Sequence, residues 1–230
     1  MREISELQSV DFSMGSYIAG AFANLEASKG PSQFNEFLTR PVAKKIYRHE
    51  FETPTDLIRS LRGSRKNEVT QVDGKISNLP QLPIVVYSRK PGMITNDDRR
   101  PIKRSVTGVS DDPTKVFEVL ILPVTLEYKL ALVAWDMPTL DRLQLVWYAY
   151  AAFNDKFLAK WVIGEEVFET TGIIEDHQAI AFTDTSEVGE SGRLYAAETD
   201  IRVSVQIAFG KAVSIPGELI LSGFHVGYLE

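Results

Sequence analysis

The chain has 230 residues, enough for one large domain or two small ones, and its 44% hydrophobic and 24% charged residues are ordinary for a globular protein. It contains no cysteine, which excludes disulfides, thiolate metal sites and cysteine nucleophiles. The net charge of −6 is unevenly spread, because residues 1–110 carry +5 and residues 111–230 carry −11. This asymmetry indicates either different surroundings for the two halves or merely differently solvated faces.

The N-terminus carries acids at Glu3, Glu6 and Asp11, where a signal peptide would have a basic and then an apolar segment. The most apolar stretch, 116–135, is interrupted by charged residues and falls short of the roughly 20 uninterrupted apolar residues that span a bilayer. We therefore expect a soluble protein that is not secreted.

The first elements in chain order are weakly patterned. Residues 13–28 predict a helix with Tyr17, Phe22 and Leu25 facing inward, although glycines weaken this expectation. Residues 41–52 place apolar side chains among charges, which is typical of an edge strand or an extended arm.

A short helix is expected to begin at Thr53 or Thr55 and to end at Gly63. Residues 84–87 then predict a short strand between two prolines. The polar, turn-rich segment 89–111 predicts a long exposed loop.

The second half is patterned more regularly. Residues 124–130 alternate between apolar and polar, which predicts a strand with one wet face, whereas 130–135 is apolar on both faces. Asp136 followed by Pro138 predicts a helix start. The helix is expected to bury these residues: Leu140, Leu143, Val146, Trp147, Tyr150, Phe153 and Phe157.

Three further segments complete the expected fold. Residues 161–174 predict a bent strand or hairpin, 183–193 a loop, and 198–210 a half-buried strand with clean alternation. The tail 217–230 fits an edge strand or an arm on a neighbour. This order of elements predicts an α+β fold, a mixed and mainly antiparallel sheet flanked by helices, with N-terminal and C-terminal extensions.

Three regions are expected along the chain. They are an N-terminal extension with short helices and an arm (1–75), a core α+β domain (76–210) and a C-terminal arm (211–230).

The sequence contains no motif that predicts catalysis, metal binding or cofactor binding. The three histidines are far apart, and no phosphate-binding loop or nucleophile elbow is present. Adjacent acids such as those between Glu165 and Asp176 leave a carboxylate-dependent hydrolase as the alternative, which would need the carboxylates to converge. We therefore expect that the protein is not an enzyme and that it has no catalytic, metal-binding or cofactor-binding site.

Two basic clusters remain without an assigned role. Their members are Arg59, Arg62, Arg65 and Lys66, and then Arg89, Lys90, Arg99, Arg100, Lys103 and Arg104. Either cluster can contact phosphates. The second includes acids and lacks interleaved aromatic residues, so a solvated loop or the acidic surface of a protein partner explains it better.

A family resemblance is carried by residues 80–210. The strand LEYKLALVAWD leads into an amphipathic helix, a hairpin region, an acidic loop and the closing strand DIRVSVQIAFG, and LPQLPIVVYS lies upstream. This order resembles the tail terminator and neck proteins, which complete the head-to-tail junction of long-tailed bacteriophages.

The resemblance implies a virion structural protein that forms a homo-oligomeric ring, commonly a hexamer, at the junction of tail and neck. Such a ring terminates the tail and joins it to the head connector; another connector or collar protein is the alternative within this class. The implied partners are copies of the chain itself, neighbouring tail tube, sheath or connector proteins, and double-stranded DNA passing through the lumen without specific binding. Assembly would occur in the host cytoplasm, with no membrane involved.

Ring assembly needs apolar or extended surfaces beyond the subunit's own core. The expected subunit or partner interface consists of Val133, Trp135, Arg89, Lys90, Arg99, Arg100, Lys103, Arg104, Leu219, Leu221, Phe224 and Tyr228. An acidic wall would repel DNA, and the residues expected to face the lumen are Glu165, Glu166, Glu175, Asp176, Asp184, Glu187 and Glu190.

Overall fold

Two very long strands organise the structure, which is a computed structural model. Strands β8 (Lys115–Ala134) and β13 (Gly192–Ser214) pair antiparallel through 20 consecutive positions, from Tyr195 opposite Ala134 to Ser214 opposite Lys115. At about 3.3 Å per residue the ribbon is about 65 Å long. The strands expected at 124–135 and 198–210 are therefore confirmed, but both extend further than their alternation predicted.

The structure describes only part of the chain. The described residues are 3–4, 7–23, 25, 32–50, 53, 56–57, 70–72, 75–77, 82–95, 102–107, 115–163, 166–177, 179–189 and 192–214.

The main sheet has the order β2-β5-β8-β13-β10-β9. Its other strands are β2 (Ile46–Arg48), β5 (Ile84–Arg89), β10 (Glu166–Glu175) and β9 (Lys156–Ile163). The β2–β5 pair is parallel and the other pairs are antiparallel, which confirms the mixed, mainly antiparallel sheet. The edge strand expected within 41–52, the strand at 84–87 and the hairpin within 161–174 are also confirmed.

Short strands complete the β structure. Strands β1 (Glu3–Ile4), β11 (Thr183–Asp184) and β12 (Glu187–Gly189) each pair with β13. The expectation of a loop throughout 183–193 is therefore wrong. Strands β3 (Thr70–Val72) and β4 (Lys75–Ser77) form a separate hairpin.

Residues 89–111 do not form one long loop. Strands β5, β6 (Ile94–Thr95) and β7 (Ile102–Thr107) pair one after another along β8, like a single strand with interruptions. Pro123 lies between the stretches of β8 that pair with β6 and β7. Proline has no N–H to donate, so it is tolerated where the ladder is interrupted.

The helices are α1 (Leu7–Ala21), α2 (Ser32–Thr39) and α4 (Met137–Phe153), with a short 3-10 helix, η1 (Val42–Lys44). Helix α4 begins as expected, because the Asp136 carboxylate accepts a hydrogen bond from the Thr139 N–H at 2.9 Å. Two inward assignments are wrong: Phe153 is 87% exposed and Leu25 is 37% exposed. Phe157 is buried, but it lies on β9.

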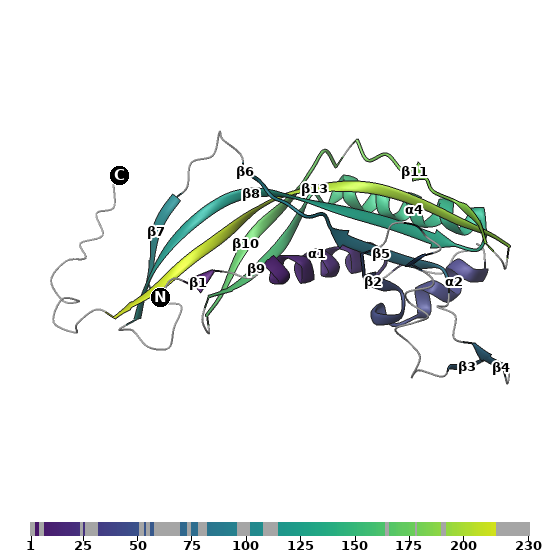
Figure 1. Ribbon diagram of the computed structural model, residues 1–230, viewed down its shortest axis with the longest axis horizontal. Helices are drawn as coiled ribbons and strands as arrows, with labels where there is room; N and C mark the ends of the chain where they lie inside the picture. The colour runs from purple at the N-terminus through teal and green to yellow at the C-terminus, as the bar shows by residue number, and fades with distance from the viewer. Residues whose placement is uncertain are drawn as a thin grey trace.

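The main core lies between the helices and one face of the sheet. The even-numbered residues of β8 from Val124 to Ala134 point into it, together with Met14 and Ile18 of α1 and Trp147 of α4. Helix α1 therefore belongs to the same core as β8, although 1–75 was expected to be an extension. Figure 1 shows α1, α2 and α4 along one part of the curved sheet, while β7 and the adjoining ends of β8 and β13 reach beyond them.

A second, smaller core covers the opposite face of the sheet at the end of β8. Its members are Leu57, Leu82, Ile84, Val86, Val133, Leu194 and Ala196, with Tyr47 and Trp135 packed against them. Leu57 follows a turn in which the Thr53 hydroxyl accepts a hydrogen bond from the Asp56 N–H at 3.1 Å, in keeping with the helix start expected there. The apolar run 130–135 is thus buried on both sides by this chain.

Candidate functional site

A fully buried carboxylate lies on the core-facing side of α1. Asp11 has 0% exposure, yet it stands in the same apolar stripe as Met14 and Ile18. A buried charge is costly unless it is paired and hydrogen-bonded, so the groups around Asp11 define a polar site inside the fold.

Three strands of the sheet supply the partners of Asp11. The Arg48 guanidinium on β2 donates to Oδ2 at 2.5 Å, and Arg89 Nε on β5 donates to Oδ1 at 3.1 Å. The Tyr128 hydroxyl on β8 donates to Oδ1 at 2.8 Å. The Tyr87 hydroxyl donates to the Asp11 main-chain carbonyl at 3.2 Å. The carboxylate therefore ties α1 to three neighbouring strands.

Close packing of α1 on β5 makes this arrangement possible. A Cβ at Gly15 would lie 2.3 Å from the Tyr87 hydroxyl oxygen, so any larger residue there would force the Tyr87 ring to shift. Burial, and then the nearby Asp11 charge, raise the pKa of Tyr128 above its ordinary value. Burial also raises the pKa of Tyr87, against the opposing effect of Arg48. Both phenols are thus held in the protonated form that donates hydrogen bonds.

A polar pocket of about 460 Å³ opens beside this cluster. It is lined by Arg48, His49, Glu50, Ser88 and Arg89, at the end of the parallel pair β2–β5. The arginine side chains are 40% and 25% exposed, so both guanidinium groups reach from Asp11 towards solvent. Their fork geometry suits a planar anion such as a carboxylate.

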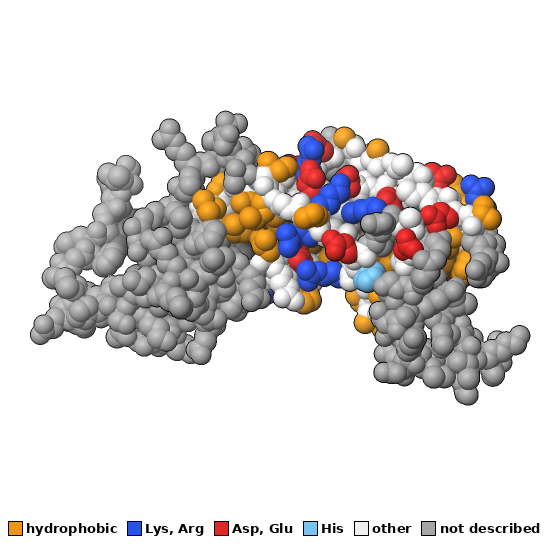
Figure 2. All heavy atoms as spheres, viewed as in Figure 1, with side chains coloured by type: hydrophobic (Ala, Val, Ile, Leu, Met, Phe, Trp, Pro, Cys, Tyr) orange, Lys and Arg blue, Asp and Glu red, His pale blue; other side chains and the backbone are white. Residues whose placement is uncertain are grey.

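The sheet face opposite the main core carries paired charges. Lys90 pairs with Asp200 at 2.7 Å, Arg202 with Glu127 at 3.0 Å, and Lys129 with Glu198 at 2.7 Å. Figure 2 shows basic and acidic side chains intermingled across the middle of the face turned to the viewer. This part of the wet face is therefore locally balanced in charge, despite the acidity of the second half.

The expected interface residues do not form one surface among the described residues. Val133 is 0% exposed inside the second core, so its apolar character reflects intramolecular packing; placing it on a subunit surface is corrected. Trp135 packs against the same core. Arg89 contacts Asp11 and Lys90 contacts Asp200, whereas Lys103 and Arg104 lie on β7. Arg99, Arg100, Leu219, Leu221, Phe224 and Tyr228 lie outside the described residues.

The expected lumen-facing acids are distributed over several elements. Glu175 accepts a hydrogen bond from the Thr125 hydroxyl at 3.2 Å. Asp184 accepts one from the Ser186 N–H at 2.9 Å, and hydrogen bonding to the Ser186 side chain, and then to this N–H, lowers the pKa of Asp184. Asp176 is exposed, and Glu187 lies on β12. Glu166 lies on β10, while Glu165 and Glu190 are outside the described residues.

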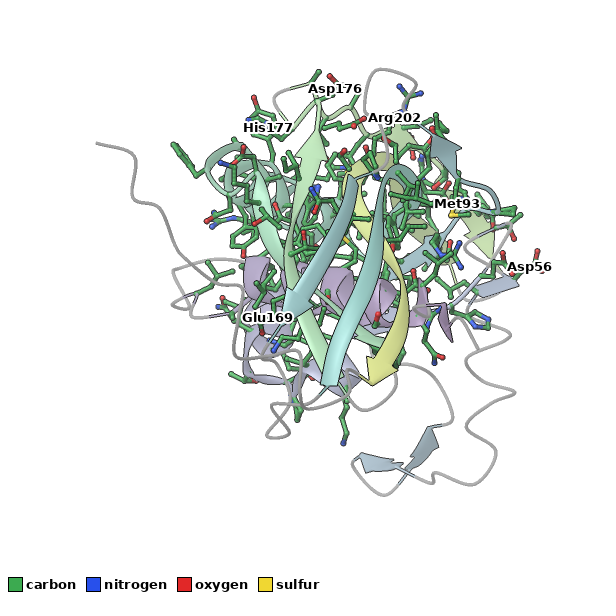
Figure 3. All side chains as sticks on the ribbon, turned by 90° about the vertical axis from the view of Figure 1, so that its left-hand side faces the viewer. Asp56, Met93, Glu169, Asp176, His177 and Arg202 are labelled. Carbon is green, nitrogen blue, oxygen red and sulfur yellow. The ribbon has the colours of Figure 1, made fainter. Side chains whose placement is uncertain are left out.

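The acids of β10 are spread along the strand. Glu169 pairs with Lys160 at 3.0 Å, and Figure 3 shows Glu169 far from Asp176 and His177. Six residues of strand separate Glu169 from Glu175, or about 20 Å, whereas glycoside hydrolases hold their carboxyl pairs within about 10 Å. In the part of the chain that the structure describes, no three His, Asp or Glu side chains are grouped to hold a metal ion.

The Asp11 cluster was not predicted from the sequence. One signal was present, because an acid in the apolar stripe of a helix implies a buried partner. Arg48, Arg89 and Tyr128 come from three separate strands, and only the sheet order brings them together.

Comparison with known proteins gives no assignment. No protein-family model matches the sequence, and a search of the curated proteins finds no match either. None of the helices described is long and apolar enough to cross a membrane.

Proposed function

We propose that this chain is a structural subunit that assembles with copies of itself into a ring, a hexamer, at the tail–neck junction of a long-tailed bacteriophage. The class rests on the resemblance of residues 80–210 to tail terminator and neck proteins. A connector or collar ring in the same particle remains the alternative, and the protein that binds the assembled ring distinguishes the two.

One observation carries the proposal of assembly. The β8–β13 ribbon, with β7 beside it, continues past α1, α2 and α4, so no described helix lies over its far end (Figure 1). The sequence of β8 at that end, KVFEVLI (115–121), is mostly apolar. An apolar sheet region needs a second layer, and a neighbouring copy can supply one.

The acidic second half fits a wall around DNA, because like charge prevents phosphate adhesion. In this proposal Asp184, Glu187 and their acidic neighbours border the bore. The basic residues beyond Lys90, up to Arg104, face another protein ring, since Arg89 and Lys90 pair with Asp11 and Asp200 of the same chain.

The test is the oligomeric state of the purified full chain. Light scattering over a wide concentration range measures its mass in solution, and electron microscopy shows whether the assembly is a ring. We expect a discrete species of six times the 25.8 kDa chain mass, visible as a ring. Val119→Arg, within the far end of β8, should shift the population to monomer because a charge opposes burial under a second layer. The matched control is Thr171→Arg, at an exposed position of β10.

Circular dichroism establishes that both variants fold. A wild-type chain that stays monomeric at about 100 µM, a concentration at which even micromolar self-association is visible, would contradict the proposal. Equal association of the two variants would show that the far end of β8 is not the surface through which the subunits assemble.

A further inference from the structure

The side of α4 that faces away from the sheet is apolar, and we call it the outward face of α4. Its large side chains are each between 45% and 87% exposed: Met137, Leu145, Tyr148 and Phe153. Residues three or four positions apart share one face of a helix, so these side chains and Ala149 form a continuous apolar strip. Asp141 and Arg142 are the only charged residues of the whole helix.

The other two α-helices that the structure describes have polar outer sides. Apart from Phe12, their exposed residues are Gln8, Ser16, Glu36 and Thr39. A helix that is apolar all round is normally buried all round. The inner side of α4 packs in the main core through residues such as Leu143 and Trp147, while its outward face stays exposed. The outward face therefore lacks the second covering layer that its composition calls for.

The far end of the β8–β13 ribbon has the complementary need. Its segment 115–121, KVFEVLI, is mostly apolar, and no described helix lies over it (Figure 1). Helix α4 has 17 residues and is about 25 Å long, and the segment 115–121 spans about 23 Å of strand. A helix packed on a sheet is the common two-layer arrangement, and here the two layers match in length.

Net charge favours the same pairing. Residues 136–155, which contain α4 and its two ends, carry three acids and one arginine, a net of −2. The end of the ribbon, 115–121 with the paired residues 208–214, carries two lysines and one glutamate, a net of +1. Opposite charge around the two apolar surfaces favours their contact with each other and opposes contact of either surface with its own copy.

We propose that the outward face of α4 in one copy of this chain packs on the far end of the β8–β13 ribbon in the next copy. The two surfaces lie towards opposite ends of the long axis of the molecule (Figure 1). A contact between two different surfaces repeats head to tail, which is the arrangement that closes rings. In the ring, α4 lies between its own sheet and the neighbour's, so both of its apolar sides are buried. This inference rests on the proposed self-assembly and names the surface that covers the ribbon.

The experiment measures self-association of the full chain by sedimentation velocity. Leu145→Lys places a charge in the outward face of α4, and Val119→Arg places one in the end of the ribbon. Each should weaken association at least about tenfold, because a charge is costly to bury in an apolar contact. Ser16→Lys is the matched control, since it adds the same charge at an exposed position on the polar side of α1. Circular dichroism checks that each variant folds, and Val119→Thr replaces the arginine variant if that one does not.

A mixture of the two variants identifies which surfaces meet. The Leu145→Lys chain keeps an intact ribbon end, and the Val119→Arg chain keeps an intact outward face of α4. One wild-type contact can therefore form between the two chains, and a second cannot. We expect a heterodimer in the equimolar mixture at a concentration where each variant alone is monomeric.

The outcomes separate this contact from ring assembly as such. Wild-type association of Leu145→Lys, or equal weakening by Ser16→Lys, would overturn the inference while leaving the ring intact. Undiminished association of Val119→Arg would mean that the outward face of α4 binds another surface, and a mixture that stays monomeric would mean that the two surfaces do not meet. Either result also overturns the inference. A wild-type chain that never self-associates contradicts the ring and this contact together.

Discussion

Asp11 shows how one residue fixes the position of a helix on a sheet. Its carboxylate accepts hydrogen bonds from Arg48, Arg89 and Tyr128, so replacing it with asparagine leaves two guanidinium groups without their counter-charge. Breaking a fully buried ion pair costs about 3–5 kcal/mol. Both arginines reach solvent here, so we expect Asp11→Asn to lower the free energy of unfolding by about 2–3 kcal/mol.

Urea unfolding followed by circular dichroism measures this change. Asp176→Asn is the control, because an exposed carboxylate contributes within about 0.5 kcal/mol. An unfolding midpoint of Asp11→Asn equal to that of the wild type would show that the cluster does not stabilise the fold.

Buried phenols predict a loss of stability at alkaline pH. Burial raises the pKa of Tyr17, and burial with the Asp11 charge raises that of Tyr128. The unfolded chain releases these protons near pH 10 while the folded chain keeps them, so the stabilisation is complete below about pH 10 and declines above it. We expect a decline of up to about 1.4 kcal/mol per pH unit for each phenol, measured by urea unfolding between pH 9 and 11.

Tyr17→Phe should make that decline shallower. Tyr148→Phe is the matched control, because its phenol on α4 is 45% exposed. Parallel alkaline profiles for the wild type and Tyr17→Phe would contradict the prediction.

At the scale of elements, the end of β8 is buried on both faces by the chain itself. Leu57, with 0% exposure, packs over Val133, Ile84 and Leu194. Leu57→Ala removes this cover and leaves a cavity, so we expect it to lower the free energy of unfolding by about 2–4 kcal/mol. Leu145→Ala on α4 is the control, because Leu145 is 63% exposed.

Thermal and urea unfolding measure both variants. Equal stability of the two would mean that the segment around Leu57 does not close the second core. Val133 belongs to the same core. Val133→Glu would place a charge in this core and is expected to unfold the subunit, so this variant is a poor probe of association.

The sequence predicted correctly those helices and strands whose formation depends on residues close together in the chain. Asp136 caps α4 as expected, and the alternation of Ile201, Val203 and Val205 places all three in the main core. β7 was missed because its residues IKRSVT carry two adjacent basic side chains, and only pairing with the distant β8 makes the segment a strand. The Asp11 site was missed likewise, because four elements converge on it.

At the scale of the whole molecule, the ribbon is covered unevenly. Helices pack on β8 between Val124 and Ala134, while at 115–121 the described cover consists of the pairing strands β7 and β13. Stability varies across a structure with the packing around each segment. In a monomer we therefore expect amide hydrogens of 115–121 to exchange faster than those of 124–134.

Hydrogen exchange with mass spectrometry, on peptides from each part of β8, tests this difference at low and high protein concentration. If the far end of the ribbon is an assembly surface, its exchange should slow by at least about tenfold on association, while the 124–134 peptides stay unchanged. Slow exchange of 115–121 already in the monomer would mean that this chain covers its own ribbon. A second copy would then have to bind elsewhere, and the outward face of α4 would be the surface to examine first.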